Sequence, residues 1–100
     1  MKASKEIPEW LTLSIEGAQV LLSTPSSVNG VKVDRLSMRS PTIREVRAAE
    51  ASVPDDEDKR EFVLFGGLTE AGHLDIEGLT VRDYKRLQTA YFRLVKEDEL

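Results

Sequence analysis

The chain has 100 residues, of which 40% are hydrophobic and 32% are charged, and its formal net charge is −4. This composition fits one domain with one modest core and excludes a disordered chain, and no apolar run approaches the ~20 residues that cross a bilayer. The chain has no cysteine, which excludes disulfides and thiolate sites and is typical of a cytosolic protein. The last 50 residues carry twelve acidic and seven basic side chains, and this acidic balance disfavours nucleic-acid binding.

The N-terminal part of the chain is expected to be a flexible leader over residues 1–9, followed by a single domain over residues 10–97. From Leu11, apolar and polar residues alternate, which favours two strands joined at Glu16-Gly17. Six apolar residues then share one face, in the pairs Ile15 with Ala18, Leu13 with Val20 and Leu11 with Leu22. The same segment also fits helical spacing, so a helix stays open as the alternative. Gly17 would weaken such a helix by roughly 1 kcal/mol.

A β-hairpin is predicted next. Residues 24–30 are expected to form a turn that ends at Asn29-Gly30, because both residues tolerate positive φ. A strand follows over residues 31–38, antiparallel to residues near 19–24. Its apolar residues change from odd to even positions at Asp34-Arg35, and a bulge there would keep them on one face.

About three helices are predicted after the strands. Thr42 and Glu45 form a capping-box pattern that starts the first helix, which runs to about residue 52. The second begins at the acidic residues 55–58 and ends at Gly66-Gly67. The third opens with Thr80 and Asp83 and carries an apolar stripe of Val81, Tyr84, Leu87, Tyr91 and Leu94. The expected fold class is therefore α+β, with a small antiparallel sheet of two or three strands before the helices.

Residues that could carry chemistry do not gather into a recognisable site. His73 is the only histidine, is expected in a loop, and has no set of metal ligands near it in the sequence. Gly66-Gly67 lacks the spacing and the lysine of a phosphate-binding loop. The sequence therefore predicts a protein that is not an enzyme, uses no cofactor and no metal, and acts by binding other proteins.

Two sets of side chains are candidates for partner binding. Phe92 and Val95 form a second apolar edge on the last helix, beside the stripe that anchors the helix to its own domain. The alternative is that a small domain uses both edges for its core. Arg39 is a further candidate, because arginines at 35, 39, 44 and 47 could form an anion-binding patch, although neighbouring acidic residues favour ordinary exposed side chains.

A family resemblance is carried by residues 19–25, 29–31 and 36–42. They resemble the tail assembly chaperone family of contractile-tailed phages and Mu-like prophages. In that family a strand ends near a proline and a glycine turn, here Pro25 and Gly30. A second strand then leads into an Arg-x-Pro-Thr junction, here Arg39, Pro41 and Thr42, before a helix.

The resemblance extends over about residues 18–95. The family's C-terminal pattern of leucines, a helix-opening aspartate and a late aromatic residue matches Leu74, Leu79, Asp83 and Phe92. Residues 1–17 are an addition to the usual start, and the linker near residues 52–60 is short and acidic.

The resemblance implies a non-virion protein in the cytoplasm of a bacterial host. It would bind the phage tape-measure protein and keep it soluble until the tail tube forms, with the tail-tube protein as a second candidate partner. No nucleic-acid or membrane partner is expected, and self-association and a longer frameshifted product stay open. The alternatives are a small regulatory or adaptor domain and a structural subunit of the tail.

Overall fold

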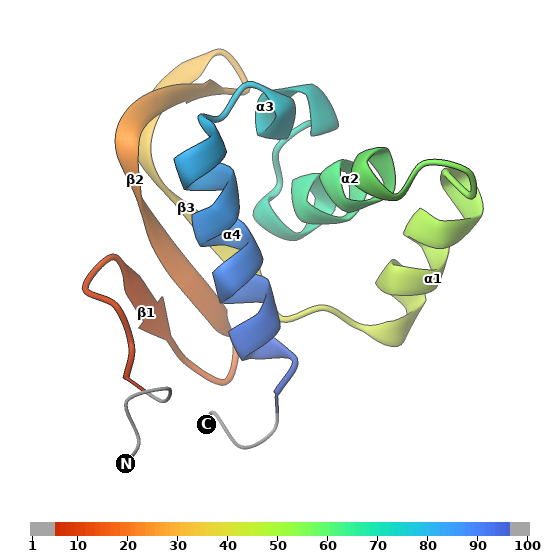
Figure 1. The fold of residues 1–100 in the computed structure, drawn as a ribbon, viewed down its shortest axis with the longest axis horizontal. Coiled ribbons are helices and arrows are strands. Elements are labelled where there is room, and N and C mark those ends of the chain that lie inside the picture. The colour runs from red at the N-terminus through yellow and green to blue at the C-terminus, as the bar shows by residue number, and fades with distance from the viewer. Residues whose placement is uncertain (1–5, 97–100) are drawn as a thin grey trace.

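The computed structural model describes residues 6–96, which form a three-stranded antiparallel sheet followed by four helices (Figure 1). The strands lie in the order β1-β2-β3, and their bounds are β1 (Leu11–Leu13), β2 (Gly17–Val28) and β3 (Val31–Arg39). The helices are α1 (Ile43–Ser52), α2 (Glu57–Thr69), α3 (His73–Glu77) and α4 (Val81–Leu94). The predicted α+β fold class is confirmed.

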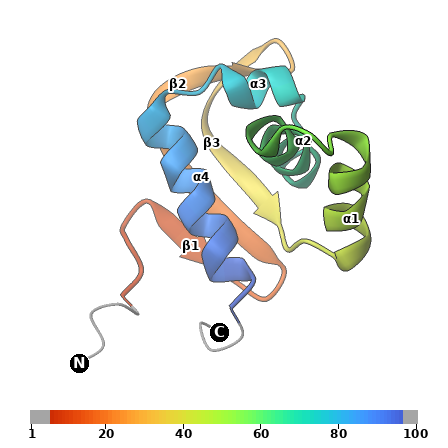
Figure 2. The same ribbon diagram turned by 45° about the vertical axis from the view of Figure 1, so that its right-hand side comes forward.

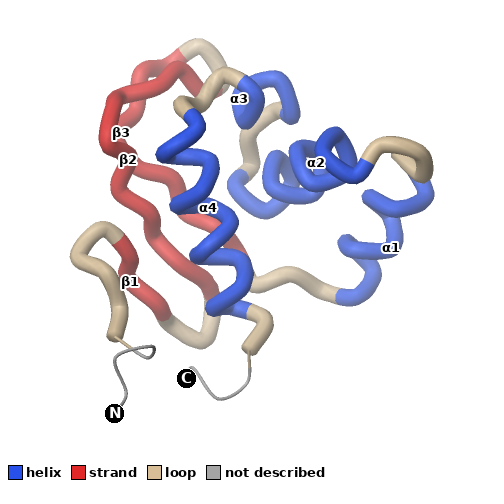
Figure 3. Tube along the Cα trace, viewed as in Figure 1, coloured by secondary structure: helices blue, strands red, loops and turns tan. Residues whose placement is uncertain are grey.

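The helices gather on one face of the sheet (Figure 3). α4 crosses that face over β2, and α2 packs beside β3 and α3 (Figures 1 and 2). α1 packs mainly on α2, at the side of the molecule away from β1. The core lies between these layers, and its most buried side chains are Val20, Met38, Phe65, Leu68, Ile76 and Leu87.

The β1–β2 pair confirms the strands but corrects their register. Leu11 lies opposite Val20 and Leu13 opposite Ala18, two residues away from the predicted pairing. Gly17 belongs to the sheet, where a Cβ on it would lie 2.3 Å from the carbonyl oxygen of Met38. The loop therefore needs more than the two predicted residues, and Ile15 lies in it with 81% of its surface exposed.

The β2–β3 hairpin confirms the predicted turn at Asn29 and Gly30, whose φ angles are 54° and 80°. The amide of Asn29 donates to Asp75 and its side chain donates to the carbonyl of Glu70, so the turn is held against the α2–α3 region. Residues 24–28 belong to β2 and not to the predicted turn, which is therefore shorter than expected.

A register shift interrupts the hairpin. The ladder passes from the Leu21–Arg35 pair to the Ser26–Val33 pair, so residues 22–25 lie opposite Asp34 alone. The shift lies at Asp34, as the predicted bulge at Asp34-Arg35 requires. The additional residues, however, belong to β2 and not to β3. Val31 is exposed, so the shift does not bring all the apolar residues of β3 to one face.

The helix ends follow the predictions at α1 and depart from them at α2. Thr42 starts α1 with a complete capping box, as expected. α2 continues through Gly66-Gly67 to Thr69 and is followed by the C-cap residue Glu70, whose φ is 60°. Gly66 serves close packing instead, because a Cβ on it would lie 3.0 Å from the carbonyl oxygen of Ala71.

Two further predictions need correction. His73 is not in a loop but begins α3, whose five residues are too few to show a helical period in the sequence. Val81 does not belong to the buried stripe of α4, since 71% of it is exposed in the first turn, and Ala90 is buried instead. Of the predicted leader, residues 1–5 lie outside the described residues, while the carbonyl of Glu6 accepts a hydrogen bond from Arg93.

Candidate functional site

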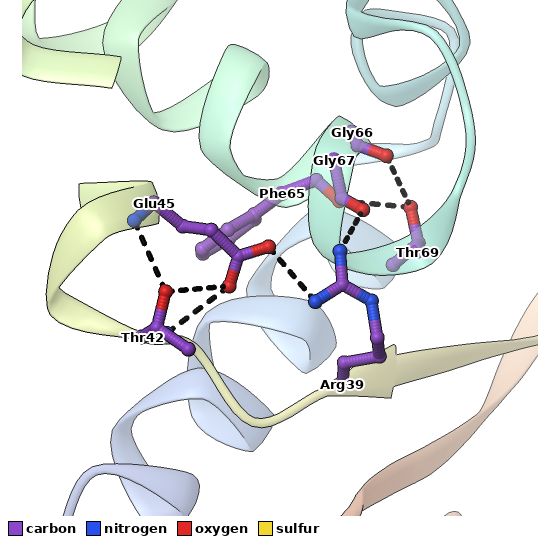
Figure 4. Close-up of polar contacts among 7 residues, drawn as sticks. All are labelled: Arg39, Thr42, Glu45, Phe65, Gly66, Gly67 and Thr69. Atoms are coloured by element: carbon purple, nitrogen blue, oxygen red, sulfur yellow. Dashed lines mark hydrogen bonds and ion pairs between the residues drawn. The ribbon is translucent and has the colours of Figure 1, made fainter. Parts of the chain in front are cut away.

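The β3–α1 junction is held by Arg39, the last residue of β3. Its guanidinium lies 2.8 Å from the Glu45 carboxylate and donates to the carbonyl oxygen of Gly67 at 2.9 Å (Figure 4). The other carboxylate oxygen of Glu45 accepts from the Thr42 amide at 3.1 Å, and the Glu45 amide donates to the Thr42 hydroxyl at 3.2 Å. Arg39 therefore joins the end of the sheet to α1 and α2.

The electrostatics of the junction favour a charged Glu45. The hydrogen bond from Arg39, followed by the one from the Thr42 amide, lowers the pKa of the Glu45 carboxyl. Between these residues, the Ser40 amide donates to the carbonyl of Glu16 at 3.0 Å, and Pro41 is half-buried. The Arg-x-Pro-Thr segment is thus a structural corner in this chain.

The interrupted part of β2 is completed by α4. The carboxylate of Asp83 is fully buried and accepts hydrogen bonds from the backbone amides of Ser23 at 2.7 Å and Thr24 at 3.3 Å. The next residue, Pro25, has no amide hydrogen to satisfy. Thr80 caps the Asp83 amide as predicted, but the Asp83 side chain binds the strand and does not complete a capping box.

Hydrogen bonding decides the ionisation of Asp83. Burial alone would raise the pKa of its carboxyl, but the bonds from Ser23 and Thr24 outweigh it, and the pKa is lowered below its ordinary value. Asp83 therefore stays ionised in the folded chain at neutral pH.

Arg86 was not anticipated from the sequence. It donates to the carbonyl of Leu21 at 2.7 Å, lies 4.0 Å from Asp83, and its guanidinium carbon is 5.0 Å from the ring centroid of Trp10. Asp83 and Arg86 are three residues apart and therefore share a face of α4, which was the only signal available in the sequence. Together they satisfy both amide and carbonyl groups of β2 where it separates from β3.

The predicted partner-binding edge lies at the C-terminal end of α4. There Phe92 is 58% exposed and Val95 is 50% exposed, while Leu87 on the predicted stripe is fully buried. The ring of Phe92 packs edge-on against Tyr91, with 6.0 Å between centroids. The structure therefore brings Phe92 and Val95 to one end of α4 and places Arg39 elsewhere, at the β3–α1 junction.

Polar and aromatic contacts hold α4 to α2. The Glu61 carboxylate accepts hydrogen bonds from the Tyr84 hydroxyl and from Gln88. Burial, and then the bond to Glu61, raises the pKa of Tyr84, so its hydroxyl remains a donor. Phe65 packs against Tyr91 with 5.3 Å between ring centroids.

An open pocket of about 240 Å³ lies between α1, α2 and α4. We call it the helical groove, and its lining residues are Val46, Ala49, Glu50, Glu57, Arg60, Glu61, Leu64 and Tyr91. Sequence reasoning did not predict this groove, because its walls come from three helices whose mutual packing has no local signature.

Residues 6–96 contain neither a metal-binding cluster nor a membrane-spanning helix. Within this range, no three His, Cys, Asp or Glu side chains are grouped so that they could hold a metal ion. None of the helices described here combines the length and apolar character that crossing a bilayer requires.

Comparison with known protein families identifies the family of the chain, which the geometry alone does not. The family of phage tail assembly chaperone proteins, E, or 41 or 14, matches residues 19–96. The chain belongs to this family. The suspected resemblance is confirmed, and as a tail assembly chaperone the chain is expected to work through protein partners in tail assembly. Neither a curated protein nor a solved structure matched the chain.

The residues that carry the family motif all lie within the matched range, and each has a structural role in the chaperone. Gly30 closes the hairpin, Pro25 lies in the interrupted strand, and Asp83 holds that strand to α4. Arg39 and Thr42 form the corner that leads into α1. β1 and the β1–β2 loop precede the matched range.

Proposed function

We propose that this tail assembly chaperone binds the tape-measure protein of its phage and keeps it soluble in the host cytoplasm until the tail tube forms. The observation that carries the proposal is the family match over residues 19–96. A long tape-measure helix exposes apolar stripes before assembly, and a small acidic domain can cover such stripes reversibly. The tail-tube protein is a second partner in this proposal, and no catalytic step is involved.

The proposed contact includes the edge formed by Phe92 and Val95. Both side chains are half-exposed on α4, outside the stripe that packs into the core. Arg39 stays a predicted contact, although its guanidinium already bonds Glu45 and Gly67 within the chain. We also propose that the folding unit begins at residue 10, since the carbonyl of Trp10 accepts from Leu21 and its ring lies over Arg86, while the predicted end of the domain at residue 97 lies outside the described residues.

Co-expression tests this function. The tape-measure protein of the same phage is produced with and without the full chaperone chain, and the soluble fraction and the co-purified complex are measured. We expect the tape-measure protein to be soluble and to co-purify only when the chaperone is present. Persistent aggregation with no complex would contradict the proposal.

The competing role as a structural subunit needs a different measurement. Mass spectrometry of purified virions is expected to find the tape-measure and tail-tube proteins without this chain. Finding this chain in finished particles, at a constant ratio to the tail-tube protein, would favour the structural role instead.

A further inference from the structure

We propose that the helical groove between α1, α2 and α4 binds one amphipathic helix of the tape-measure protein, with Lys or Arg side chains beside its apolar stripe. The apolar stripe would lie along Tyr91 and Phe92, and the basic side chains would lie beside Glu50 and Glu57. This inference rests on the proposed function and assigns it a surface and a partner chemistry.

The apolar part of the groove comes from three helices. Val46 and Ala49 of α1 form one wall, Leu64 of α2 lies between the helices, and Tyr91 of α4 forms the other wall. The ring of Phe92 packs against Tyr91 and extends this wall onto the exposed edge of α4.

The other side of the groove is continued by Ile43. It is exposed and lies one turn before Val46 on α1. Exposed apolar groups therefore flank the pocket on both sides, as in grooves that receive the apolar face of a helix.

Negative charge dominates the rest of the lining. Glu50, Glu57 and Glu61 all line the pocket, and Arg60 is the one cation among its lining residues. The guanidinium of Arg60 donates to the carbonyls of Val53 and Pro54, so it is directed to the α1–α2 loop. A partner that fits this lining carries positive charge.

The titration of Tyr91 agrees with a negative field in the groove. Burial, followed by the charges of Glu61 and Glu50, raises the pKa of the Tyr91 hydroxyl. The glutamates that line the groove disfavour a nucleic acid, whose phosphates are negative, and favour a helix with basic flanks.

A second copy of this chain is the main competing occupant, because α4 itself carries exposed basic residues such as Arg82 and Lys85. The apolar stripe of that α4 is already buried in its own core through Leu87 and Ala90. What it leaves exposed near its C-terminal end is the short edge of Phe92 and Val95, whereas the proposed function gives a tape-measure helix a whole apolar stripe to place on Tyr91.

A charge-reversal experiment tests the inference with the full chaperone and purified fragments of the tape-measure protein. The double variant E50K/E57K changes the groove, and the matched control E70K/E77K makes the same charge change on exposed residues outside its lining. We expect the Kd of E50K/E57K for the bound fragment to rise by about tenfold or more, and the Kd of the control to stay within about twofold. Thermal melts of both variants check that they fold.

A compensating variant sharpens the test. Changing the flanking Lys or Arg residues of the bound fragment to Glu is expected to weaken its binding to the wild-type chaperone and restore binding to E50K/E57K. Restored binding would identify the groove as the contact, because a loss of folding in the chaperone cannot be repaired by a change in the partner.

Three results would overturn the inference. If E50K/E57K binds the fragment as tightly as the control does, the groove is not the site, although the proposed function stands. If the wild-type chain sediments as a dimer and E50K/E57K as a monomer, while both bind the fragment equally well, the occupant of the groove is a second copy. If the wild-type chaperone binds no tape-measure fragment at all, the proposed function and this inference both fail.

Discussion

Asp83 shows how one side chain can complete a strand. Its carboxylate accepts from the amides of Ser23 and Thr24 in the segment of β2 that has left the ladder with β3. Without these bonds the two amides would lose the partner that the carboxylate supplies, at a cost of about 1–3 kcal/mol for each amide left unsatisfied. One buried residue on α4 thus permits the irregular path of β2.

The substitution Asp83→Asn tests this role. The amide side chain keeps the size of the residue but loses the charge and can place an NH₂ group against the donor amides. We expect the free energy of unfolding to fall by about 2–4 kcal/mol in urea titrations. Asp34→Asn, at an exposed ion pair with Arg35, is the control and should change it by less than about 1 kcal/mol.

Acid sensitivity should follow from the same residue. The pKa of Asp83 is lowered from 3.8 in the folded chain, so its contribution to stability is complete above the unfolded value and is lost as pH falls through the folded one. Glu45, whose pKa is also lowered, acts in the same direction. Urea midpoints measured from about pH 5 to about pH 2 should therefore fall, with a shallower slope for Asp83→Asn. Equal slopes for the two proteins would assign the acid sensitivity to other groups.

Helix α1 depends on its first turn more than on burial, because Ala49 is its one buried residue. The capping box of Thr42 and Glu45 satisfies two backbone amides that would otherwise lack partners. Arg39 adds a link from Glu45 to α2. The position of α1 is therefore fixed mainly by the capping box and the ion pair at its N-terminus.

Thr42→Ala removes this cap. We expect a loss of about 1 kcal/mol in the free energy of unfolding, measured by denaturant melts, while Thr42→Ser retains the hydroxyl and most of the stability. A Thr42→Ala melt that overlays the wild-type curve would show that the cap contributes little.

Substitutions at two glycines distinguish a steric clash in the sheet from a gain in helix stability. A Cβ at Gly17 would collide with the Met38 carbonyl, whereas a Cβ at Gly67 has no atom within 4 Å and lies inside α2. Gly17→Ala is expected to lower stability by about 1–3 kcal/mol, and Gly67→Ala to raise it by about 0.4–1 kcal/mol. Thermal melts of the two variants should shift in opposite directions, and a shift of the same sign would contradict the close approach at Gly17.

At the scale of the whole molecule, α4 has one task that the structure shows, anchoring the helix through its buried face, and a second that is proposed, binding a partner through its exposed edge. Leu87 and Ala90 are buried in the core, whereas Phe92 and Val95 are exposed, and the ring of Phe92 packs against Tyr91, which lines the helical groove. A small domain can thus be stabilised by one face of its last helix and keep the other available for a partner.

Leu87→Ala and Phe92→Ser should separate these tasks. The first is expected to lower stability by about 2–5 kcal/mol, because it leaves a cavity in the core. The second should leave the melt nearly unchanged and weaken co-purification of the tape-measure protein, while Leu74→Ser, at a residue 70% exposed on α3, leaves both unchanged. Unfolding of Phe92→Ser to the same extent as Leu87→Ala would place Phe92 in the core.

Features that depend on neighbouring residues were determined by the sequence itself. The Asn29-Gly30 turn, the Thr42 cap, the bounds of α1 and α4 and the exposure of Phe92 and Val95 all follow from backbone preferences or helical spacing within a few residues. The family resemblance rested on the same local segments, and for that reason it could be recognised without the fold.

Contacts between distant segments were decided only by the tertiary structure. The register of β1 depends on Gly17 meeting Met38, the path of α2 through Gly66 depends on the following loop, and Asp83 bonds an amide 60 residues away. The helical groove likewise needs α1, α2 and α4 together. A pattern in the sequence reports the preferences of nearby residues, whereas register, buried polar pairs and grooves depend on which surfaces meet when the whole chain packs.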